Sequence, residues 1–588
     1  MAALPLGDGT DAARSGGCGS HRERPSGQCE TTMDETELIR MPILYKIAET
    51  ERDRELVAHL NYRTFVEEIP QHEANEARRL IDRYDAENTY LLAMDGERLA
   101  GMLAVRDRRP FSMDAKIERF ERFLPVQPKR MVEIRLLAVD PAYRRSRVLF
   151  GLIRFLDRYL ERGDYDMGII SGTTRELHLY RHLGFLPFAE LVGREGAWYQ
   201  PMYLTRASYE ASRAYRYMKR DVQFLAGPVE VAPEVERAMQ GRPLSHRSQA
   251  FMRMHGEVRR KLCAMSNAAS VHLMLGSGTL ANDAVAGQLK RYGGRGLVLV
   301  NGEFGRRLTV HARRWALPFD TLESEYGQPL HYEGVRAAAA GGKYAWLWAV
   351  HGETSTGVLN DLAQLKQVCR EYGMRLAVDG VSSLGAVPTD LSGVSWASGV
   401  SGKALGAYTG LCFVFQGDEP RVSGDAQDLL PVYMDVAAYE QSAGIPFSQS
   451  SNLLAALDAA LRAFETDAPY AHTASRYRLI RSAVEEMGLR VLAPREHQAP
   501  YILTIALPKE LSSRELGQRM LDQGFALQFE SGYLLERNWL QIASLGHLKE
   551  KDIVRMLDVL RLFVETMGKR RQLPLTKEAG PQAVAANR

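Results

Sequence analysis

The chain has 588 residues, of which 45% are hydrophobic and 25% are charged, so its composition predicts a globular protein of several domains. Its 75 basic and 72 acidic residues nearly balance, which argues against nucleic acid as the main partner. The apolar runs are too short to span a membrane, and the five cysteines, which form no Cys-x-x-Cys pair, predict no metal site and fit a cytoplasmic protein.

The two ends of the chain differ in composition from its middle. Residues 1–38 are rich in Gly, Ser, Asp, Glu and Arg and show no apolar periodicity, so we expect this segment to be disordered. The polar tail 571–588 is expected to be disordered as well. Between these ends we predict a first domain at 40–205, a charged helical connector at 206–222 and a second domain at 223–570.

The first domain alternates strand-like and helix-like patterns, as α/β folds do. Apolar runs predict strands at Thr89–Met94, Arg98–Val105, Val132–Val139 and Met167–Gly172. Amphipathic patterns predict helices at Val148–Glu161 and Arg175–Leu183.

Short motifs in this domain resemble the GCN5-related N-acetyltransferase (GNAT) fold, in its acyl-homoserine-lactone and N-acyl amino acid synthase branch. These motifs are Tyr62-Arg-Thr-Phe, Asp82-Arg-Tyr-Asp, Glu133-Ile-Arg135, the turn Arg144-Arg-Ser-Arg147 and Tyr180-Arg-His-Leu-Gly-Phe. The resemblance implies transfer of an acyl group from a thioester to an amine, which needs a general base and a general acid. By matched position, Glu133 and Tyr180 are the candidates for these two roles.

The turn that would bind the pyrophosphate of the thioester carries no glycine before Gly151, and side chains there hinder close backbone approach. The co-substrate is therefore either an acyl-CoA or an acyl chain on a carrier protein that meets the surface arginines. In the alternative interpretation Glu133 forms a salt bridge with Arg135, Tyr180 is a core aromatic, and the domain is a non-catalytic ligand-binding or dimer-organising module.

The second domain has strands that read as nearly continuous apolar runs, at Gly296–Val300, Tyr344–Val350 and Leu376–Val378. Such runs are typical of strands covered on both faces, and they predict a largely parallel α/β sheet.

Four polar segments in this domain suggest a cofactor site. The turn Leu275–Asn282 is rich in glycine and begins a helical pattern, which suits a phosphate. Asp379 follows a strand, where a carboxylate can pair with a ring nitrogen, and Lys403 lies among small residues, where an amine can form an imine. The segment His351–Asn360 supplies short donors. Taken singly, the turn and the lysine are better explained by a plain tight turn and an exposed side chain, and the other two segments are equally explained by a helix cap and a polar loop.

Taken in order, the motifs of the second domain resemble the class V aminotransferases, which include alanine–glyoxylate, serine–glyoxylate and 2-aminoethylphosphonate transaminases. The motifs are Gly227-Pro-Val-Glu-Val-Ala-Pro, Leu244-Ser-His-Arg-Ser, Gly276-Ser-Gly-Thr, Asn301-Gly-Glu-Phe-Gly, His351-Gly-Glu-Thr-Ser-Thr-Gly, Val378-Asp-Gly-Val-Ser-Ser and Ser401-Gly-Lys-Ala-Leu. The resemblance implies the fold-type I architecture of pyridoxal 5'-phosphate (PLP) enzymes: a large domain with a mostly parallel sheet and a small C-terminal α/β domain.

The same resemblance implies a role for each matching residue. Lys403 holds PLP as a Schiff base, and Asp379 pairs with the pyridine nitrogen. The other cofactor-binding positions are Ser277, Gly278 and Thr279 at the phosphate, Phe304 stacked on the ring, Val381 on its other face, Thr354 and Ser401 near it, and Ser448 reaching the phosphate of a partner subunit. The expected enzyme is a homodimer that moves an amino group from a small amine or amino acid to an oxo-acid acceptor.

Two positions depart from the family pattern. Gly402 stands where the family often has Gln, and Gln541 stands where an Arg usually clamps the anionic group of the substrate. Either this group is bound elsewhere, by Arg247 or Arg537, or the substrate lacks it. A PLP-dependent lyase is the alternative reaction. A desulfurase is disfavoured because no cysteine follows Cys412.

Overall fold

The computed structural model describes residues 42–69, 72–144, 146–194, 197–218, 221–417, 430–466 and 469–570. The segments 1–38 and 571–588, which the sequence predicts to be disordered, lie outside the described residues.

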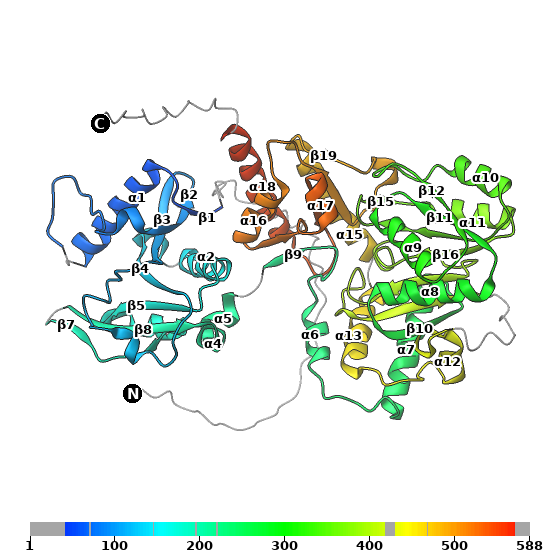
Figure 1. Cartoon of the computed structure of the whole chain (residues 1–588), viewed down its shortest axis with the longest axis horizontal. Helices are drawn as coiled ribbons and strands as arrows, with labels where there is room; N and C mark the ends of the chain where they lie inside the picture. Colours follow the sequence, from blue (N-terminus) through cyan, green and yellow to red (C-terminus); the bar gives the residue numbers. More distant parts are fainter. Residues whose placement is uncertain are drawn as a thin grey trace, which may run out of the picture. The chain divides into compact units, whose positions relative to one another are not determined.

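The first domain is built on a sheet of eight strands in the order β1-β2-β3-β4-β5-β8-β6, with β7 paired to β8 (Figure 1). Its strands are β1 (Leu44–Ile47), β2 (Thr89–Asp95), β3 (Arg98–Arg106), β4 (Met131–Val139), β5 (Met167–Thr173), β6 (Leu186–Pro187), β7 (Val192–Arg194) and β8 (Ala197–Thr205). The strands β4 and β5 are parallel, and their neighbours in the sheet are antiparallel. All four strands predicted in this domain are confirmed.

Helices cover both faces of this sheet. They are α1 (Glu51–Tyr62), α2 (Val148–Arg162) and α3 (Leu177–His182). Leu152, Phe155 and Leu156 of α2 pack on one face, and Val57 and Leu60 of α1 pack on the other. The predicted helices are confirmed, although the second one begins with a short 3₁₀ turn before α3. The connector contains two short helices, α4 (Arg206–Glu210) and α5 (Arg213–Met218), and the exact domain boundaries stay a prediction.

The second domain contains a sheet of seven strands in the order β10-β18-β17-β16-β13-β11-β12. Its strands are β10 (Ser270–Gly276), β11 (Arg295–Val300), β12 (Phe319–Glu323), β13 (Tyr344–Val350), β16 (Arg375–Asp379), β17 (Trp396–Val400) and β18 (Gly410–Gln416). β18 alone runs opposite to the other six strands, so the predicted, mostly parallel sheet is confirmed. A short hairpin of β14 (Gly352–Glu353) and β15 (Val358–Leu359) follows β13.

Helices lie on both faces of the large sheet, which explains the continuous apolar runs of its strands. One face packs against α8 (Gly278–Tyr292) and α9 (Glu303–Arg314). The other face packs against α7 (Gln249–Ser266), α10 (Tyr332–Gly341), α11 (Leu362–Glu371) and α13 (Ser451–Leu461). The remaining helices beside this sheet are α6 (Pro233–Met239), α12 (Val436–Gln441) and α14 (Ala463–Thr466).

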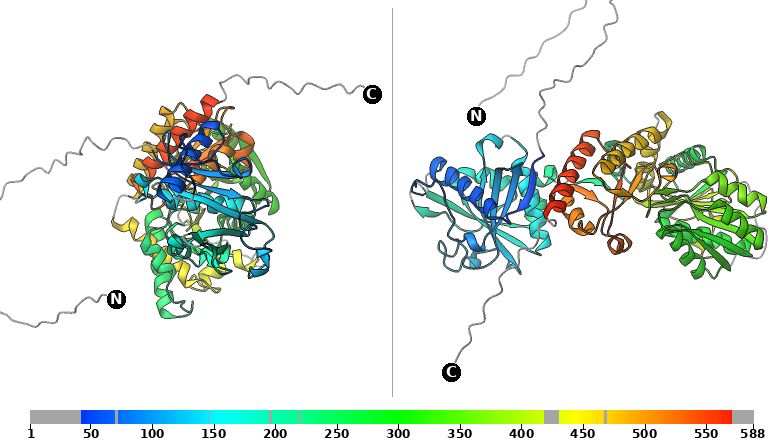
Figure 2. Two further views of the ribbon diagram at one scale, coloured as in Figure 1. Left: turned by 90° about the vertical axis from the view of Figure 1, so that its left-hand side faces the viewer. Right: turned by 90° about the horizontal axis from the view of Figure 1, so that it is seen from above.

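The last part of the chain forms a smaller α/β unit with its own core, drawn in orange and red in Figure 2. Its strands are β19 (Arg490–Val491), β20 (Ile502–Ala506) and β22 (Trp539–Ala543) in one sheet, and β21 (Phe525–Leu527) paired with β9 (Val222–Phe224). Its helices are α15 (Pro469–Glu486), α16 (Ser513–Asp522), α17 (Gly532–Arg537) and α18 (Glu550–Arg570).

The expected division of the second domain into a large and a small α/β part is thus confirmed. Within the described ranges, none of the helices has both the length and the apolar character needed to cross a membrane.

Candidate active site

The carboxyl ends of the parallel strands bring the predicted PLP-site residues of the second domain together. Asp379 ends β16, Lys403 follows β17, and Phe304 lies in the helix that follows β11. These strands run in one direction, so the segments after them meet at one edge of the sheet, where open α/β sheets bind ligands. The Nζ atom of Lys403 lies 5.4 Å from the centroid of the Phe304 ring.

The carboxylate of Asp379 is buried and held in a fixed orientation. One oxygen accepts a hydrogen bond of 2.8 Å from the amide nitrogen of Asn282. The other accepts one of 2.9 Å from the backbone N–H of Val381. The sequence singled out Asp379 and Val381 but not Asn282, whose position one turn into α8 is the only sequence signal for this contact.

Burial lowers the pKa of the Lys403 amine below its usual value, and the attraction of Asp379 and Glu353 offsets this effect only in part. The guanidinium of Arg307 lowers the same pKa further. More of this amine is therefore neutral near pH 7 than of an exposed lysine, and the neutral form is the nucleophile that attacks a carbonyl.

Glu353 is a buried carboxylate whose role the sequence did not predict. It accepts hydrogen bonds from the backbone N–H groups of Phe304 (3.3 Å) and Gly305 (3.0 Å), at the start of α9. A Cβ atom on Gly302 would lie 2.3 Å from Cδ of Glu353, so only glycine fits there. Burial raises the pKa of Glu353, although these donors work against the shift. Glu353 thus fixes the start of α9 and with it Phe304.

The predicted phosphate residues lie at the start of α8. Ser277 is its N-cap residue and makes no side-chain capping bond, and α8 begins at Gly278. The side chains of Ser277 and Thr279 are exposed. A Cβ on Gly278 would lie 2.9 Å from a methyl group of Val381, so the glycine lets this turn approach Val381. The first N–H groups of a 15-residue helix form a favourable anion site.

The loop that carries Lys403 is tightly packed. The buried hydroxyl of Ser401 donates to the carbonyl of Tyr408 at 2.6 Å, so it serves the loop itself. A Cβ at position 402 would lie 2.7 Å from Cα of Thr409, which explains why glycine replaces the Gln of the family pattern. Gly227, which the sequence did not assign to the site, packs against the Lys403 stem: a Cβ there would lie 3.2 Å from Cγ of Lys403.

The remaining predicted residues are placed as follows. Thr354 is buried at the hairpin after β13, and Ser448 is exposed in the loop between α12 and α13. Gln541 is buried in β22, where its amide donates to the carbonyl of Thr354 at 2.6 Å and to the hydroxyl of Thr504 at 2.8 Å. The amide of Gln541 is thus used within the fold.

These residues fit PLP by their chemistry. They place an amine of lowered pKa, a fixed carboxylate and an aromatic ring next to the N–H groups that begin α8. The buried amide oxygen of Asn282 has no hydrogen-bond partner among the described residues, so this oxygen can accept a hydrogen bond from a bound ligand. Lys403, Asp379, Phe304 and the start of α8 are the groups that would hold the cofactor.

The first domain has a separate cavity of about 600 Å³ between β4 and β5. These strands pair only from Met131 to Glu133, and their following residues line the cavity. Leu136 in β4 has a left-handed backbone (φ 52°), which is rare for a residue with a side chain and marks a break in the sheet. Both predicted residues of this domain, Glu133 and Tyr180, line the cavity.

Glu133 and Tyr180 have different surroundings. Buried Glu133 accepts hydrogen bonds from the backbone N–H groups of Ser112 (2.7 Å) and Met113 (3.2 Å), and Arg135 lies 3.7 Å from it. The contact with Arg135 is the salt bridge expected if Glu133 has a structural role. The position of Glu133 in the cavity is also compatible with the proposed role of a base. Burial raises the pKa of Tyr180, so its phenol stays protonated and can donate a proton.

Two arginines of the GNAT-like motifs are engaged within the domain. Arg144, in the turn before α2, pairs with both carboxylate oxygens of Glu68. Arg135 forms two hydrogen bonds, of 3.0 and 3.2 Å, with Asp82 at the cavity wall. Arg145, the next residue of the turn, lies outside the described residues.

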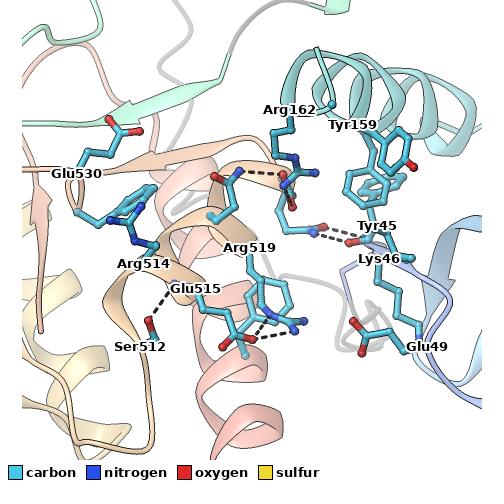
Figure 3. Close-up of a pocket in the computed structure, with 18 of the residues that line it drawn as sticks. Tyr45, Lys46, Glu49, Tyr159, Arg162, Ser512, Arg514, Glu515, Arg519 and Glu530 are labelled. Atoms are coloured by element: carbon cyan, nitrogen blue, oxygen red, sulfur yellow. Dashed lines mark hydrogen bonds and ion pairs between the residues drawn. The ribbon is translucent and has the colours of Figure 1, made fainter. Parts of the chain in front are cut away.

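A further pocket of about 900 Å³ contains none of the predicted site residues (Figure 3). Figure 3 shows Arg519 pointing at Glu515, with which it forms an ion pair of 3.0 Å. The amide of Gln523 bonds to the backbone of Tyr45 from both its atoms, at 2.9 and 2.8 Å. Arg519, Glu515 and Gln523 are thus engaged in contacts within the fold.

Comparison with known proteins agrees with both sequence resemblances. The family model described as acetyltransferase (GNAT) domain matches residues 60–154, and the one described as aminotransferase class-V matches residues 234–417. A 2-aminoethylphosphonate–pyruvate transaminase of Pseudomonas fluorescens (strain Pf0-1) is 30% identical over 313 residues, which are 51% of this chain and 84% of that protein. The enzyme of the same name from Pseudomonas aeruginosa (strain PAO1) is 33% identical over 285 residues, or 46% and 76% of the two chains.

Solved structures are similar over the second domain. Alanine–glyoxylate aminotransferase from Nostoc sp. is 26% identical with a TM-score of 0.54, covering 58% of this chain and 95% of that chain. An aspartate aminotransferase from Thermus thermophilus is also 26% identical, with a TM-score of 0.53, covering 59% of this chain and 100% of that chain. The fold-type I architecture expected from the sequence is confirmed.

The lowered pKa of Lys403 predicts a distinctive pH profile of labelling. In cofactor-free protein, we expect acylation of Lys403 by acetic anhydride to reach its plateau at a lower pH than acylation of an exposed lysine, because less alkali is needed to deprotonate the buried amine. Mass spectrometry of labelled peptides over a pH series measures both profiles. Each rate is normalised to its own plateau, so that burial does not bias the comparison. Coinciding profiles would contradict this account of the amine.

Proposed function

The chain belongs to the class V aminotransferase family, whose fold implies PLP, and we propose that Lys403 attaches this cofactor for transfer of an amino group between a small amine or amino acid and a 2-oxo acid. The observation that carries the proposal is the convergence of Lys403, Asp379 and Phe304 at one edge of the sheet. When bound, PLP supplies an electron sink that allows a C–H bond next to the substrate nitrogen to break.

We propose a separate role for each residue around the cofactor. The amine of Lys403 would hold the cofactor and, once released, would take a proton from the substrate carbon, which its lowered pKa permits near neutral pH. The fixed carboxylate of Asp379 holds a proton at the ring nitrogen. The Phe304 ring would pack on the cofactor, and the N–H groups at the start of α8 would bind its phosphate.

The named relatives suggest the first substrates to test. Because they are 2-aminoethylphosphonate–pyruvate transaminases, we take 2-aminoethylphosphonate as the first candidate donor and pyruvate as the first candidate acceptor. The proposal also includes a cytoplasmic homodimer. Exposed Ser448 is the residue proposed to reach a partner subunit's cofactor, and the free cysteines Cys263, Cys369 and Cys412 suit a reducing compartment.

A half-reaction tests transamination against the lyase alternative. With PLP-loaded enzyme and 2-aminoethylphosphonate alone, we expect the visible absorption band to disappear while one equivalent of the aldehyde product forms. Pyruvate should then restore the band and yield alanine. The Lys403→Ala variant should lose this cycle by several orders of magnitude, because it loses both attachment and proton transfer. Many turnovers with release of ammonia and no loss of the band would mean that the enzyme is a lyase.

We further propose that the first domain transfers an acyl group from a thioester to an amine. The observation that favours this activity is the cavity between the separating strands β4 and β5, which Glu133 and Tyr180 both line. The thioester gives its acyl carbon to the amine nitrogen, Glu133 or a water beside it takes the proton of the amine, and Tyr180 protonates the thiolate that leaves. The donor is an acyl-CoA or an acyl-carrier-protein thioester.

Thiol release by the full-length chain tests the acyltransferase proposal. We expect Glu133→Gln and Tyr180→Phe each to lower amine-dependent thiol release from acyl-CoA or acyl carrier protein by about 10²- to 10⁴-fold, the usual worth of general acid–base catalysis. The variant Tyr215→Phe changes a tyrosine outside the cavity lining and serves as control. If both variants keep the wild-type rate, the two roles are wrong. If no thioester reacts in the wild type, the domain is a binding module.

A further inference from the structure

The buried amide of Gln541 leaves the anionic end of a substrate without an assigned partner in the second domain. Both of its donors are used, on the carbonyl of Thr354 and the hydroxyl of Thr504, and its oxygen accepts from the hydroxyl of Tyr533 at 3.1 Å. A ligand would have to break these bonds to reach Gln541, at a cost that a neutral amide does not offset. The anion must therefore be bound by other groups if the substrate carries one.

Two guanidinium groups flank the ring of Tyr326, which lies in the loop after β12. The Cζ atom of Arg537 lies 5.0 Å from the centroid of this ring, and that of Arg306 lies 5.6 Å from it. The phenolic oxygen of Tyr326 is buried and has no hydrogen-bond partner among the described residues. Two cations and an unpaired hydroxyl thus share one place, which we call the Tyr326 cluster.

The two guanidinium groups of the Tyr326 cluster have no strong ion pair among the described residues, although the carboxylates of Glu303 and Glu353 also act on the Tyr326 phenol. Arg306 is exposed and forms no ion pair with any residue in the described ranges. The nearest carboxylate to Arg537 is that of its neighbour Glu536, at 3.7 Å, and the Glu536 side chain is 75% exposed. Such a weak, exposed pair leaves both guanidinium groups able to bind an anion from solution.

The cluster is connected to the reactive amine by the chain itself. Arg306 lies in the first turn of α9, as Phe304 does, and the carboxylate of Glu353 acts electrostatically on both the Tyr326 phenol and the Lys403 amine. On the other side, Arg537 donates to the carbonyl of Tyr533, and the hydroxyl of Tyr533 bonds to Gln541. The cluster therefore belongs to the surroundings of the site and not to a remote surface.

We propose that Arg306, Arg537 and Tyr326 form the subsite that binds the carboxylate or phosphonate group of the amino donor and of the oxo-acid acceptor. Planar guanidinium groups bind such oxyanions through paired hydrogen bonds, and the phenol supplies a further donor. Burial raises the pKa of Tyr326, so its O–H group stays protonated at neutral pH. The inference rests on the proposed transaminase function and narrows its substrates to small amino compounds with an anionic group.

Steady-state kinetics and direct binding test the subsite. We expect Arg306→Gln and Arg537→Gln each to raise the KM for pyruvate by about tenfold to a hundredfold while kcat changes far less, because each removes a charge-assisted hydrogen bond that binds the substrate in both ground and transition states. Tyr326→Phe should raise KM less.

Calorimetry with ethylphosphonate gives a readout that does not depend on turnover. This probe carries the anionic group without an amine, and PLP-loaded wild-type enzyme should bind it more tightly than either arginine variant. The matched control is Arg313→Gln, which removes the same charge from an exposed arginine two turns further along α9. Circular dichroism and PLP content establish that each variant is folded, and Arg306→Lys and Arg537→Lys should recover part of the affinity.

The outcomes separate the subsite from the proposed reaction. An enzyme that transaminates no donor but binds ethylphosphonate through Arg306 and Arg537 would contradict the proposed function and leave the subsite standing. The subsite is overturned if the wild type does not bind ethylphosphonate, or if both arginine variants behave like Arg313→Gln.

Discussion

The hydrogen bonds that hold the carboxylate of Asp379 fix the geometry on which the second domain depends. Asn282 contacts one oxygen from α8 and the N–H of Val381 contacts the other, so one negative charge is held where β16 ends. This charge attracts the amine of Lys403, which burial would otherwise leave still less basic. The same contacts tie α8, whose first N–H groups are the proposed phosphate site, to the strand that carries Asp379. A cofactor placed here would meet an amine, a carboxylate and an anion site that are already in position.

The two domains differ in how the polar residues of their sheets reach a ligand-accessible position. In the second domain, parallel strands end together, and the loops after them supply the site. In the first domain, the strands β4 and β5 separate after Glu133, and the gap between them is the cavity. With each domain active as proposed, linkage in one chain would raise the effective concentration of an amine that one domain makes and the other acylates.

Much of the fold was predictable because hydrophobic periodicity records burial. The continuous runs at β11, β13 and β16 predicted a covered parallel sheet, and the glycine-rich turn predicted the start of α8. Contacts between distant segments were not predictable. The residues next to Gly227 in the sequence do not indicate that it packs on the Lys403 side chain. The same holds for the hydrogen bonds of Glu353 at the start of α9 and for those of the Gln541 amide within the fold. The strand that carries Glu133 was predicted, whereas its hydrogen bonds from the backbone at 112–113 depend on contacts between distant segments, and its role as a base stays a prediction.

The attachment of the cofactor is the claim on which the account of the second domain rests. Reduction of the PLP-loaded, full-length protein with borohydride, followed by peptide mass spectrometry, measures which amine carries the coenzyme. The account predicts one phosphopyridoxyl group per chain, on Lys403, and a large loss of visible absorbance and of bound cofactor in Asp379→Ala. A label on another lysine, or a protein that takes up no PLP, would contradict it.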